Sequence, residues 1–246
     1  MNEIERLSEI LSQSKNAVFF GGAGMSTESG IPDFRSANGI FSKAFNATLR
    51  PEEIVSHSFF MHCPEDFFEF YRTRIVYLDA KPNAGHLALA ELERRGILSA
   101  VVTQNIDGLH QAAGSKVVLE LHGSVRRSFC MNCGENYDLN YIVENKPIPY
   151  CQKCGGIVRP DVVLYEENLD ERILKESIKA ISKADTLIVG GTSLVVYPAA
   201  GLVDYFNGEY LVVINKSGTR ADVEAELIIR ENIGETLSKA VEMIEQ

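Results

Sequence analysis

Five continuous apolar runs, each closed by glycine or by polar residues, constrain the fold of this 246-residue chain most strongly. Such runs are typical of parallel strands covered on both faces, because these strands have no solvent side that requires alternating polar residues. Helical patterns separate the runs, as in residues 83–96 and 170–184, and a further helix ends the chain. This alternation predicts a doubly wound, Rossmann-like parallel α/β sheet. The expected strands are residues 17–22, 98–105, 117–121, 185–191 and 210–215.

Four cysteines form two C-x-x-C pairs, Cys130 with Cys133 and Cys151 with Cys154, separated by 17 residues. This spacing is typical of tetrahedral zinc sites. Four thiolates fill the coordination sphere and leave no position for water, so we predict one structural zinc ion. The alternative is two surface thiol pairs or a redox pair. Cys63 lies outside the pattern and is interpreted as a buried small residue.

Two stretches interrupt the alternation of strands and helices. Residues 37–80 are helical in pattern and rich in aromatic side chains, and residues 125–157 contain the cysteines. We interpret both as insertions that form a smaller domain with a helical and a zinc-binding part. The Rossmann-like nucleotide-binding domain is then expected to comprise residues 1–36, 81–124 and 158–246.

Polar residues follow four of the expected strands, at the sheet edge where ligands bind in open α/β folds. Gly22 and Gly24 fit the first two glycines of G-x-G-x-x-G, but Thr27 stands in place of the third. No acidic residue ends a second strand about 20 residues later, which disfavours an ordinary hydride-transfer site. Asn105 and Asp107 could also cap the next helix. The other polar-loop residues at this edge are Gln104, Gly191, Thr192, Ser193, Asn215 and Lys216.

His122 follows the third expected strand and is the candidate general base, since neutral histidine accepts a proton near pH 7. A lone histidine is more often structural, but Gly123 follows this one and the polar loop of residues 104–107 lies at the same edge. The remaining histidines fall in helical or loop contexts and are interpreted as structural; they are His57, His62, His86 and His110.

Together these motifs resemble the sirtuin family of NAD-dependent protein deacylases, in its bacterial or archaeal form with a single catalytic core. The segments that carry the resemblance are GAGMSTESGIPDFR, TQNID, LHG, the two C-x-x-C pairs, RPDVVLYEE, GTSLVVYP and IN. They span nearly the whole chain. The resemblance implies that NAD is a consumed co-substrate and that acylated-lysine proteins or peptides are the partners. Free lysine, nicotinamide and O-acyl-ADP-ribose would be the products.

The resemblance also implies roles for individual residues. In the first loop the dinucleotide contacts would be Gly22, Ala23, Gly24, Thr27, Phe34 and Arg35. The nicotinamide pocket and its ribose would be held by Gln104, Asn105, Ile106 and Asp107. His122 would take a proton from a ribose hydroxyl. The adenosine side would be formed by Gly191, Thr192, Ser193, Asn215, Lys216, Asn232 and Ile233.

Residues 160–167 resemble the segment that pairs with the peptide substrate as an added strand, with Val162, Val163, Leu164 and Tyr165 as contacts. The family often has glycine where this chain has Glu166, whose carboxylate would favour cationic residues or point to solvent. Tyr71 and Arg74 form a Y-x-x-R pair similar to the one by which some sirtuins recognise succinyl or malonyl groups. Such i, i+3 spacing also arises by chance, and we expect acetyl-lysine.

A formal net charge of −10 disfavours binding to nucleic acid or to an anionic membrane. No apolar run approaches the ~20 residues of a membrane helix, and residues 1–16 form an amphipathic helix rather than a signal peptide. We therefore expect a cytoplasmic protein, and a monomer. The leading function is NAD-dependent lysine deacetylation. The alternatives are mono-ADP-ribosyl transfer from the same NAD site, removal of succinyl or malonyl groups, and a non-catalytic NAD- or peptide-binding module.

Overall fold

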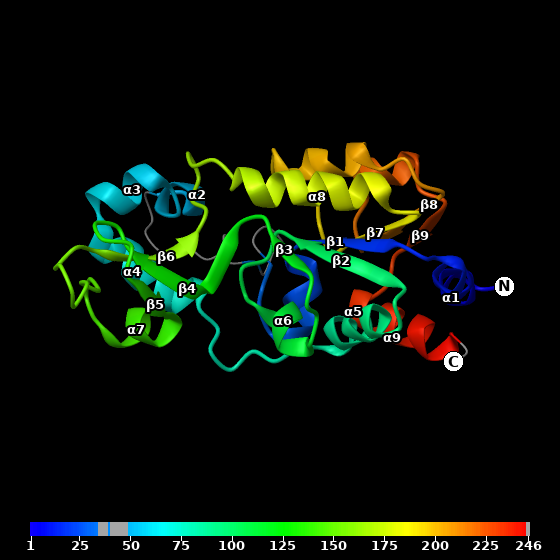
Figure 1. Cartoon of the computed structure of the whole chain (residues 1–246), viewed down its shortest axis with the longest axis horizontal. Helices are drawn as coiled ribbons and strands as arrows, with labels where there is room; N and C mark the ends of the chain where they lie inside the picture. Colours follow the sequence, from blue (N-terminus) through cyan, green and yellow to red (C-terminus); the bar gives the residue numbers. More distant parts are fainter. Residues whose placement is uncertain (34–38, 40–48, 245–246) are drawn as a thin grey trace.

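The computed structural model describes residues 1–33, 39 and 49–244, which form two parts side by side (Figure 1). The larger part is built on a six-stranded sheet, and the smaller part combines short helices with a three-stranded sheet. Phe34 and Arg35, two of the expected dinucleotide contacts, lie outside the described residues.

The large sheet has the strand order β3-β2-β1-β7-β8-β9, and every pairing in it is parallel. The predicted doubly wound sheet is thus confirmed. The order reverses between β1 and β7, so the chain leaves these neighbouring strands in opposite directions and opens a crevice at their carboxyl ends. β9 was not expected, because its three apolar residues stand between the charged Glu226 and Arg230 and form no longer apolar run. The strands are β1 Ala17–Gly21, β2 Leu98–Thr103, β3 Val118–Glu120, β7 Thr186–Gly190, β8 Tyr210–Ile214 and β9 Leu227–Ile229.

Helices cover both faces of this sheet (Figure 1). One face packs against α1 (Glu3–Gln13), α5 (Ala84–Arg94) and α9 (Ile233–Met243), and the other against α8 (Glu171–Lys183) and the 3-10 helix η4 (Ala199–Tyr205). All five residues of β1 and of β7 are buried, as expected for central strands covered on both sides. None of the described helices combines the length and apolar character needed to cross a membrane.

The smaller part joins two separate segments of the chain. Its sheet has the order β5-β4-β6 and is antiparallel. Residues 158–162 were expected in the Rossmann-like domain, but as β6 they pair with β4 and lie in the small sheet. The elements are α2 Pro51–Ile54, α3 His57–His62, α4 Pro64–Phe70, the π-helix η3 Tyr71–Ile75, β4 Gly123–Cys130, β5 Asn136–Asp138, α7 Leu139–Glu144 and β6 Val158–Val162.

Candidate active site

A cavity of about 800 Å³ lies between the two parts, where the carboxyl ends of β1, β2, β7 and β8 meet. Its size suits a dinucleotide, since ligand sites usually measure about 300–1,000 Å³. Residues from every predicted polar loop line it, together with the predicted substrate segment. The predicted site residues of the large part that line the cavity are Gly22, Ala23, Gly24, Thr27, Gln104, Asn105, Ile106, His122, Gly191, Thr192, Ser193, Asn215, Lys216, Asn232 and Ile233.

Two glycines allow the loops after β1 and β7 to meet closely. The Gly24 amide donates to the Gly191 carbonyl at 2.8 Å. A Cβ on Gly24 would lie 2.7 Å from Gly191 Cα, and one on Gly191 would lie 2.4 Å from the Met25 nitrogen. Gly191 also has φ +60°, a conformation that other residues rarely adopt. Backbone contact therefore forms the floor of the cavity at this point.

Ser26 connects the first loop to the loop after β2. It lies in the 3-10 helix η1 (Ala23–Ser29), and its hydroxyl accepts from Asn105 Nδ2 at 3.0 Å and donates to Asp107 Oδ2 at 2.7 Å. The other hydrogen of the Asn105 amide goes to the Gly22 carbonyl at 3.1 Å. Because both amide hydrogens are used within the loops, Oδ1 of Asn105 is the group left to accept from a ligand.

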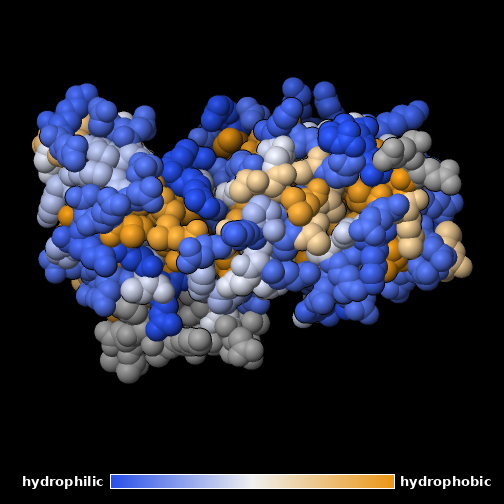
Figure 2. Space-filling view, turned by 90° about the horizontal axis from the view of Figure 1, so that it is seen from below, coloured by the Kyte–Doolittle hydropathy of each residue, from blue (hydrophilic) through white to orange (hydrophobic). Residues whose placement is uncertain are grey.

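Asp107 lines a second cavity of about 40 Å³ beside the first. Its Oδ1 accepts from the amide of Leu109, two residues later, at 2.8 Å and closes a turn just before α6 (Leu109–Ala113). The N-cap of α6 is Gly108, without a side-chain cap bond, so the expectation that Asp107 could cap the helix is not met. Hydrophobic residues gather on the underside of the smaller part (Figure 2). The walls of the 40 Å³ cavity are largely apolar. Its apolar lining includes Ile31, Pro32, Ile75, Ile106, Val125 and Leu139.

His122 follows β3 and lines the large cavity. Its Nδ1 lies 3.0 Å from the Gln104 carbonyl, which can only accept, so Nδ1 carries the hydrogen and Nε2 has the free lone pair. In the described part of the chain Nε2 has no hydrogen-bond partner. Burial lowers the pKa of His122 below the usual 6.5, and the Gln104 carbonyl offsets this only in part. The imidazole is therefore neutral at pH 7 and can accept a proton.

The loops after β2, β7 and β8 form the other end of the large cavity. Gln104 Nε2 donates to Thr192 Oγ1 at 2.9 Å, which ties two of these loops together. Asn215 donates its side-chain amide to the Ser217 carbonyl at 2.7 Å and so shapes the turn after β8. Lys216 is exposed at the rim. Hydroxyl, amide and ammonium groups here can bind ribose hydroxyls and phosphates.

Sequence reasoning missed the roles of Ser26 and Glu28. The partners of Ser26 lie 79 and 81 residues away in the chain, so no local pattern indicates them. Glu28 accepts from the Gly234 amide at 2.8 Å and links η1 to the start of α9. Their only signal is that both polar side chains belong to the glycine-rich turn after the first strand.

Residues 162–165, which were predicted to contact the peptide substrate, begin at the last residue of β6 and line the large cavity. The Val163 amide donates to the His122 carbonyl at 3.0 Å, and the Tyr165 amide donates to the Val55 carbonyl at 3.0 Å. Glu166 has φ 76° and accepts from the Ser58 amide at 2.9 Å. Its carboxylate therefore caps the start of α3, which neither expectation for this residue had included.

An ion-pair cluster holds the same segment from behind. Arg159 NH1 and NH2 lie 2.7 and 3.0 Å from the Glu167 carboxylate, which also pairs with His57 Nδ1 at 2.8 Å. Partial burial alone would raise the pKa of Glu167. Hydrogen bonds from Arg159, the Leu164 amide and His57 outweigh burial and lower the pKa to about 2. Glu167 is therefore ionised at neutral pH, and its hydrogen bonds fix the loop in place.

Tyr71 and Arg74 are not brought together in the cavity. Tyr71 lines it and is only 2% exposed, and its hydroxyl has no hydrogen-bond partner among the described residues. Arg74 lines neither cavity. Both belong to the π-helix η3, whose wider turn rotates residue i+3 further away than an α-helix would.

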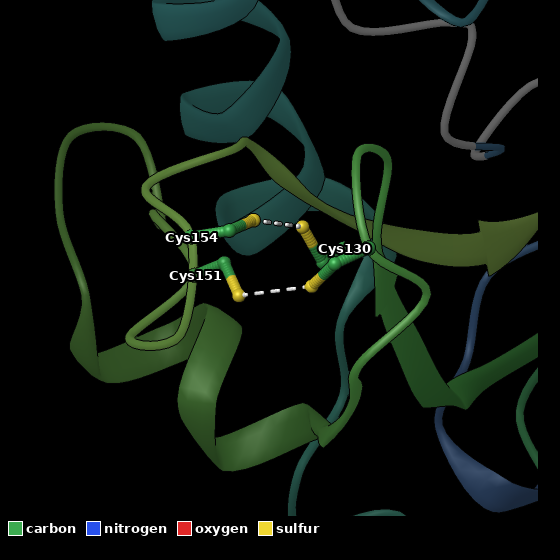
Figure 3. A group of neighbouring side chains, drawn as sticks. Cys130, Cys151 and Cys154 are labelled. Atoms are coloured by element: carbon green, nitrogen blue, oxygen red, sulfur yellow. Dashed lines mark hydrogen bonds between the residues drawn. The ribbon is translucent and has the colours of Figure 1, made fainter.

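The four predicted zinc ligands converge in the smaller part. Cys130, Cys151 and Cys154 direct their sulfur atoms toward one point from two loops (Figure 3). All four sulfur atoms lie within 4.8 Å of one another, with Cys130 and Cys154 at 3.4 Å and Cys133 and Cys151 at 3.6 Å. A zinc tetrahedron with Zn–S bonds of about 2.3 Å has sulfur–sulfur edges close to these. The geometry fits one zinc ion with four thiolate ligands.

The fold and the site thus define a nucleotide-binding α/β protein with a four-cysteine module and a buried neutral histidine at the cavity. The model of the Sir2 family matches residues 22–198. Because that match covers most of the chain, the protein belongs to the Sir2, or sirtuin, family, as its motifs indicated.

Curated relatives and solved structures are similar to this chain over nearly its full length. An NAD-dependent protein deacetylase of Clostridium perfringens (strain 13 / Type A) is 60% identical over 242 residues, or 98% of this chain and 99% of the relative. An NAD-dependent protein deacetylase of Cutibacterium acnes (strain DSM 16379 / KPA171202) is 53% identical, over 95% of this chain and 96% of the relative. A structure described as Sir2-p53 peptide-NAD+ has a TM-score of 0.85 and 39% identity, and 98% of each chain is covered. A Sir2 structure with a propionylated peptide has a TM-score of 0.86 and 38% identity, over 99% and 100%.

The cysteine cluster yields a direct prediction. Cys130→Ser should release the metal, because a hydroxyl is a poor substitute for a thiolate at a closed zinc site. Cys130 ends β4 and is buried, so a loss of stability of about 3 kcal/mol, or roughly 6–12 °C in Tm, should follow. Zinc content and thermal unfolding measure both effects. Cys63→Ser is the matched control and should keep its zinc; a Cys130→Ser protein with full zinc content would contradict the assignment.

Proposed function

We propose that this chain is an NAD-dependent protein lysine deacylase that transfers the acyl group of an acyl-lysine to ADP-ribose and releases nicotinamide. The observation that carries this proposal is the neutral His122, with a free Nε2, in the cavity that the polar loops share with the substrate segment. A histidine buried only for packing would not line a cavity of this size with an unpaired nitrogen.

Two ends of the cavity suit two ends of the dinucleotide. Asp107 and the amide oxygen of Asn105 accept hydrogen bonds and suit the nicotinamide carboxamide and its ribose. Thr192, Asn215 and Lys216 suit the adenosine side. Asp107 is held by Ser26 and by the Leu109 amide, so it is preorganised before a ligand arrives.

The chemistry needs no nucleophile from the protein. NAD supplies, when bound, a ribose carbon from which nicotinamide can leave, and the acyl oxygen of the substrate lysine can attack that carbon. Nε2 of His122 would accept a proton from a ribose hydroxyl, whose oxygen then attacks the acyl carbon, while the hydrogen on Nδ1 stays with the Gln104 carbonyl. Such a base is typically worth about 10²–10⁴-fold in rate. The bond from the acyl carbon to the lysine nitrogen breaks as the amine leaves, and one water supplies the oxygen that completes O-acyl-ADP-ribose.

The peptide would add a strand beside residues 162–165, since main-chain hydrogen bonds give affinity for extended peptides independent of side-chain sequence. The acyl group would lie near Tyr71, whose surroundings are apolar and include Phe67 and Ile75. This environment favours acetyl over succinyl or malonyl, because Arg74 does not line the cavity. The C-x-x-C thiolates require a reducing compartment, which supports the cytoplasm as the location.

Mass spectrometry of acetyl- and succinyl-lysine peptides, each with and without NAD, tests this function. We expect loss of acetyl only with NAD, matched by one O-acetyl-ADP-ribose and one nicotinamide. Faster loss of succinyl would contradict the acetyl preference and bring Arg74 into the acyl site. An ADP-ribose added to a protein acceptor without deacylation would support the transferase instead, and no turnover of either peptide would contradict the deacylase.

The pH profile tests His122 itself. Since the general base must be neutral and burial lowers the pKa of His122, kcat/KM should fall toward acid with a midpoint below 6.5 and stay level above it. His122→Ala should reduce kcat about 10²–10⁴-fold and remove this acid limb. His62→Ala, at an exposed histidine, is the control and should match the wild type. A midpoint above 6.5, or an active His122→Ala variant, would contradict the role.

A further inference from the structure

Two buried histidines that the proposed reaction does not use lie beside the loop of Asp107. His110 stands three residues after Asp107 on α6 and is 1% exposed, and His86 on the first turn of α5 is 0% exposed. Their ring centroids are 4.7 Å apart, with the ring planes at 57°. The ring centroid of Phe19 of β1 lies 6.0 Å from that of His110.

The nitrogen atoms of this pair are poorly satisfied. The Asn83 amide donates to His86 Nδ1 at 3.3 Å, so Nε2 of His86 carries the hydrogen. This Nε2 and both nitrogens of His110 are buried without a hydrogen-bond partner among the described residues. Buried polar groups are normally paired, and a helix–helix contact made only for packing would use apolar side chains. The exception therefore requires an explanation in terms of function.

The two histidines stand on the elements that hold the nicotinamide end. Asn83, at the start of α5, donates from Nδ2 to the Met25 carbonyl at 2.8 Å and to Ser29 Oγ at 3.0 Å, so α5 supports η1 and with it Ser26. The Asp107 carboxylate accepts from the amide of Leu109, the first residue of α6. The contact between His86 and His110 thus connects the support of Ser26 with the support of Asp107.

We propose that His86 and His110 are positioning residues for the nicotinamide end. In their neutral form, their rings add to the hydrogen bonds that hold Ser26 and Asp107 in position relative to each other. This inference rests on the proposed role of Asp107. The adenosine end depends on the loops after β7 and β8, and among the described residues no hydrogen bond or ring contact joins either histidine to them. A change that disturbs the two histidines should therefore weaken the binding of nicotinamide more than the binding of ADP-ribose.

The charges around the pair make its contact sensitive to acid. Burial lowers the pKa of His86 to about 4, and Asp107 opposes this only weakly; burial and then His86 lower the pKa of His110 to about 3. Other acids on the neighbouring elements are engaged, since Glu28 of η1 binds the Gly234 amide and Glu235 of α9 pairs with Lys239. Unfolded histidine titrates near 6.5. Below that pH the opened state binds more protons, so the contact weakens as the pH falls from 6.5 toward 4.

The test compares two ligands of the same site. Binding of nicotinamide to ADP-ribose-saturated protein, and of ADP-ribose alone, is measured by calorimetry between pH 5.5 and 8. His110→Ala should raise the nicotinamide Kd about tenfold, because small displacements of a site are costly, and should change the ADP-ribose Kd less than about twofold. His110→Phe keeps a ring between Phe19 and His86, so it should restore nicotinamide binding and make its loss in acid shallower than in the wild type.

Leu237→Ala is the matched control, since Leu237 is equally buried in the same core but lies on α9. Leu237→Ala is expected to weaken the binding of both ligands alike. The proposal is overturned if His110→Ala does the same. It is also overturned if His110→Phe loses nicotinamide binding in acid as fully as the wild type. Asp107→Asn separates the two levels of the argument. If Asp107→Asn weakens nicotinamide binding and His110→Ala does not, only the positioning role of the histidines is wrong. If Asp107→Asn leaves nicotinamide binding unchanged, the assignment of Asp107 to the nicotinamide pocket is wrong as well.

Discussion

The reversal of strand order between β1 and β7 is the constraint on which the rest of the site depends. Because the chain leaves these neighbouring strands in opposite directions, their carboxyl ends cannot be covered by one connection, and a crevice remains. Gly24 and Gly191 let the two loops touch through backbone alone, which keeps the crevice open to a ligand. Any larger residue at Gly191 would meet the backbone of Met25. The dinucleotide site is thus a consequence of topology that two glycines complete.

The reacting end is assembled from distant parts of the chain. Asn105, Ser26 and Asp107 form one chain of hydrogen bonds in which each donor and acceptor is assigned, so the carboxylate is fixed. The smaller part adds the substrate segment, and the Val163 amide bound to the His122 carbonyl joins this segment to the proposed base. The four cysteines stabilise the module that carries the segment, at a distance from the reaction. A zinc ion bound by the four cysteines would therefore have a structural role, and the proposed chemistry lies in the cavity between the two parts.

Much of this arrangement could be predicted from the sequence, because apolar runs reveal buried parallel strands and the fold then places their polar ends at one edge. The same logic gave Gly22, Gln104, His122, Thr192 and Asn215. The C-x-x-C spacing gave the four cysteines, and the family resemblance added Ala23, Ile106, Asn232 and Ile233. It could not give β9, whose three apolar residues lie between charged ones. It also could not give the bonds of Ser26 or the His86–His110 contact, which join residues far apart in the chain. The Y-x-x-R pair shows the opposite error. Spacing suggested a shared face, but the π-helix rotates Arg74 away from Tyr71.

The most direct measurement of the central claim is a crystal structure of the chain with NAD and an acetyl-lysine peptide, prepared with His122→Ala to prevent turnover. The account predicts the nicotinamide carboxamide within hydrogen-bond distance of Asp107, the adenosine ribose beside Asn215, and the peptide extended along residues 162–165. A dinucleotide bound in the reverse direction, or a peptide away from this segment, would contradict it.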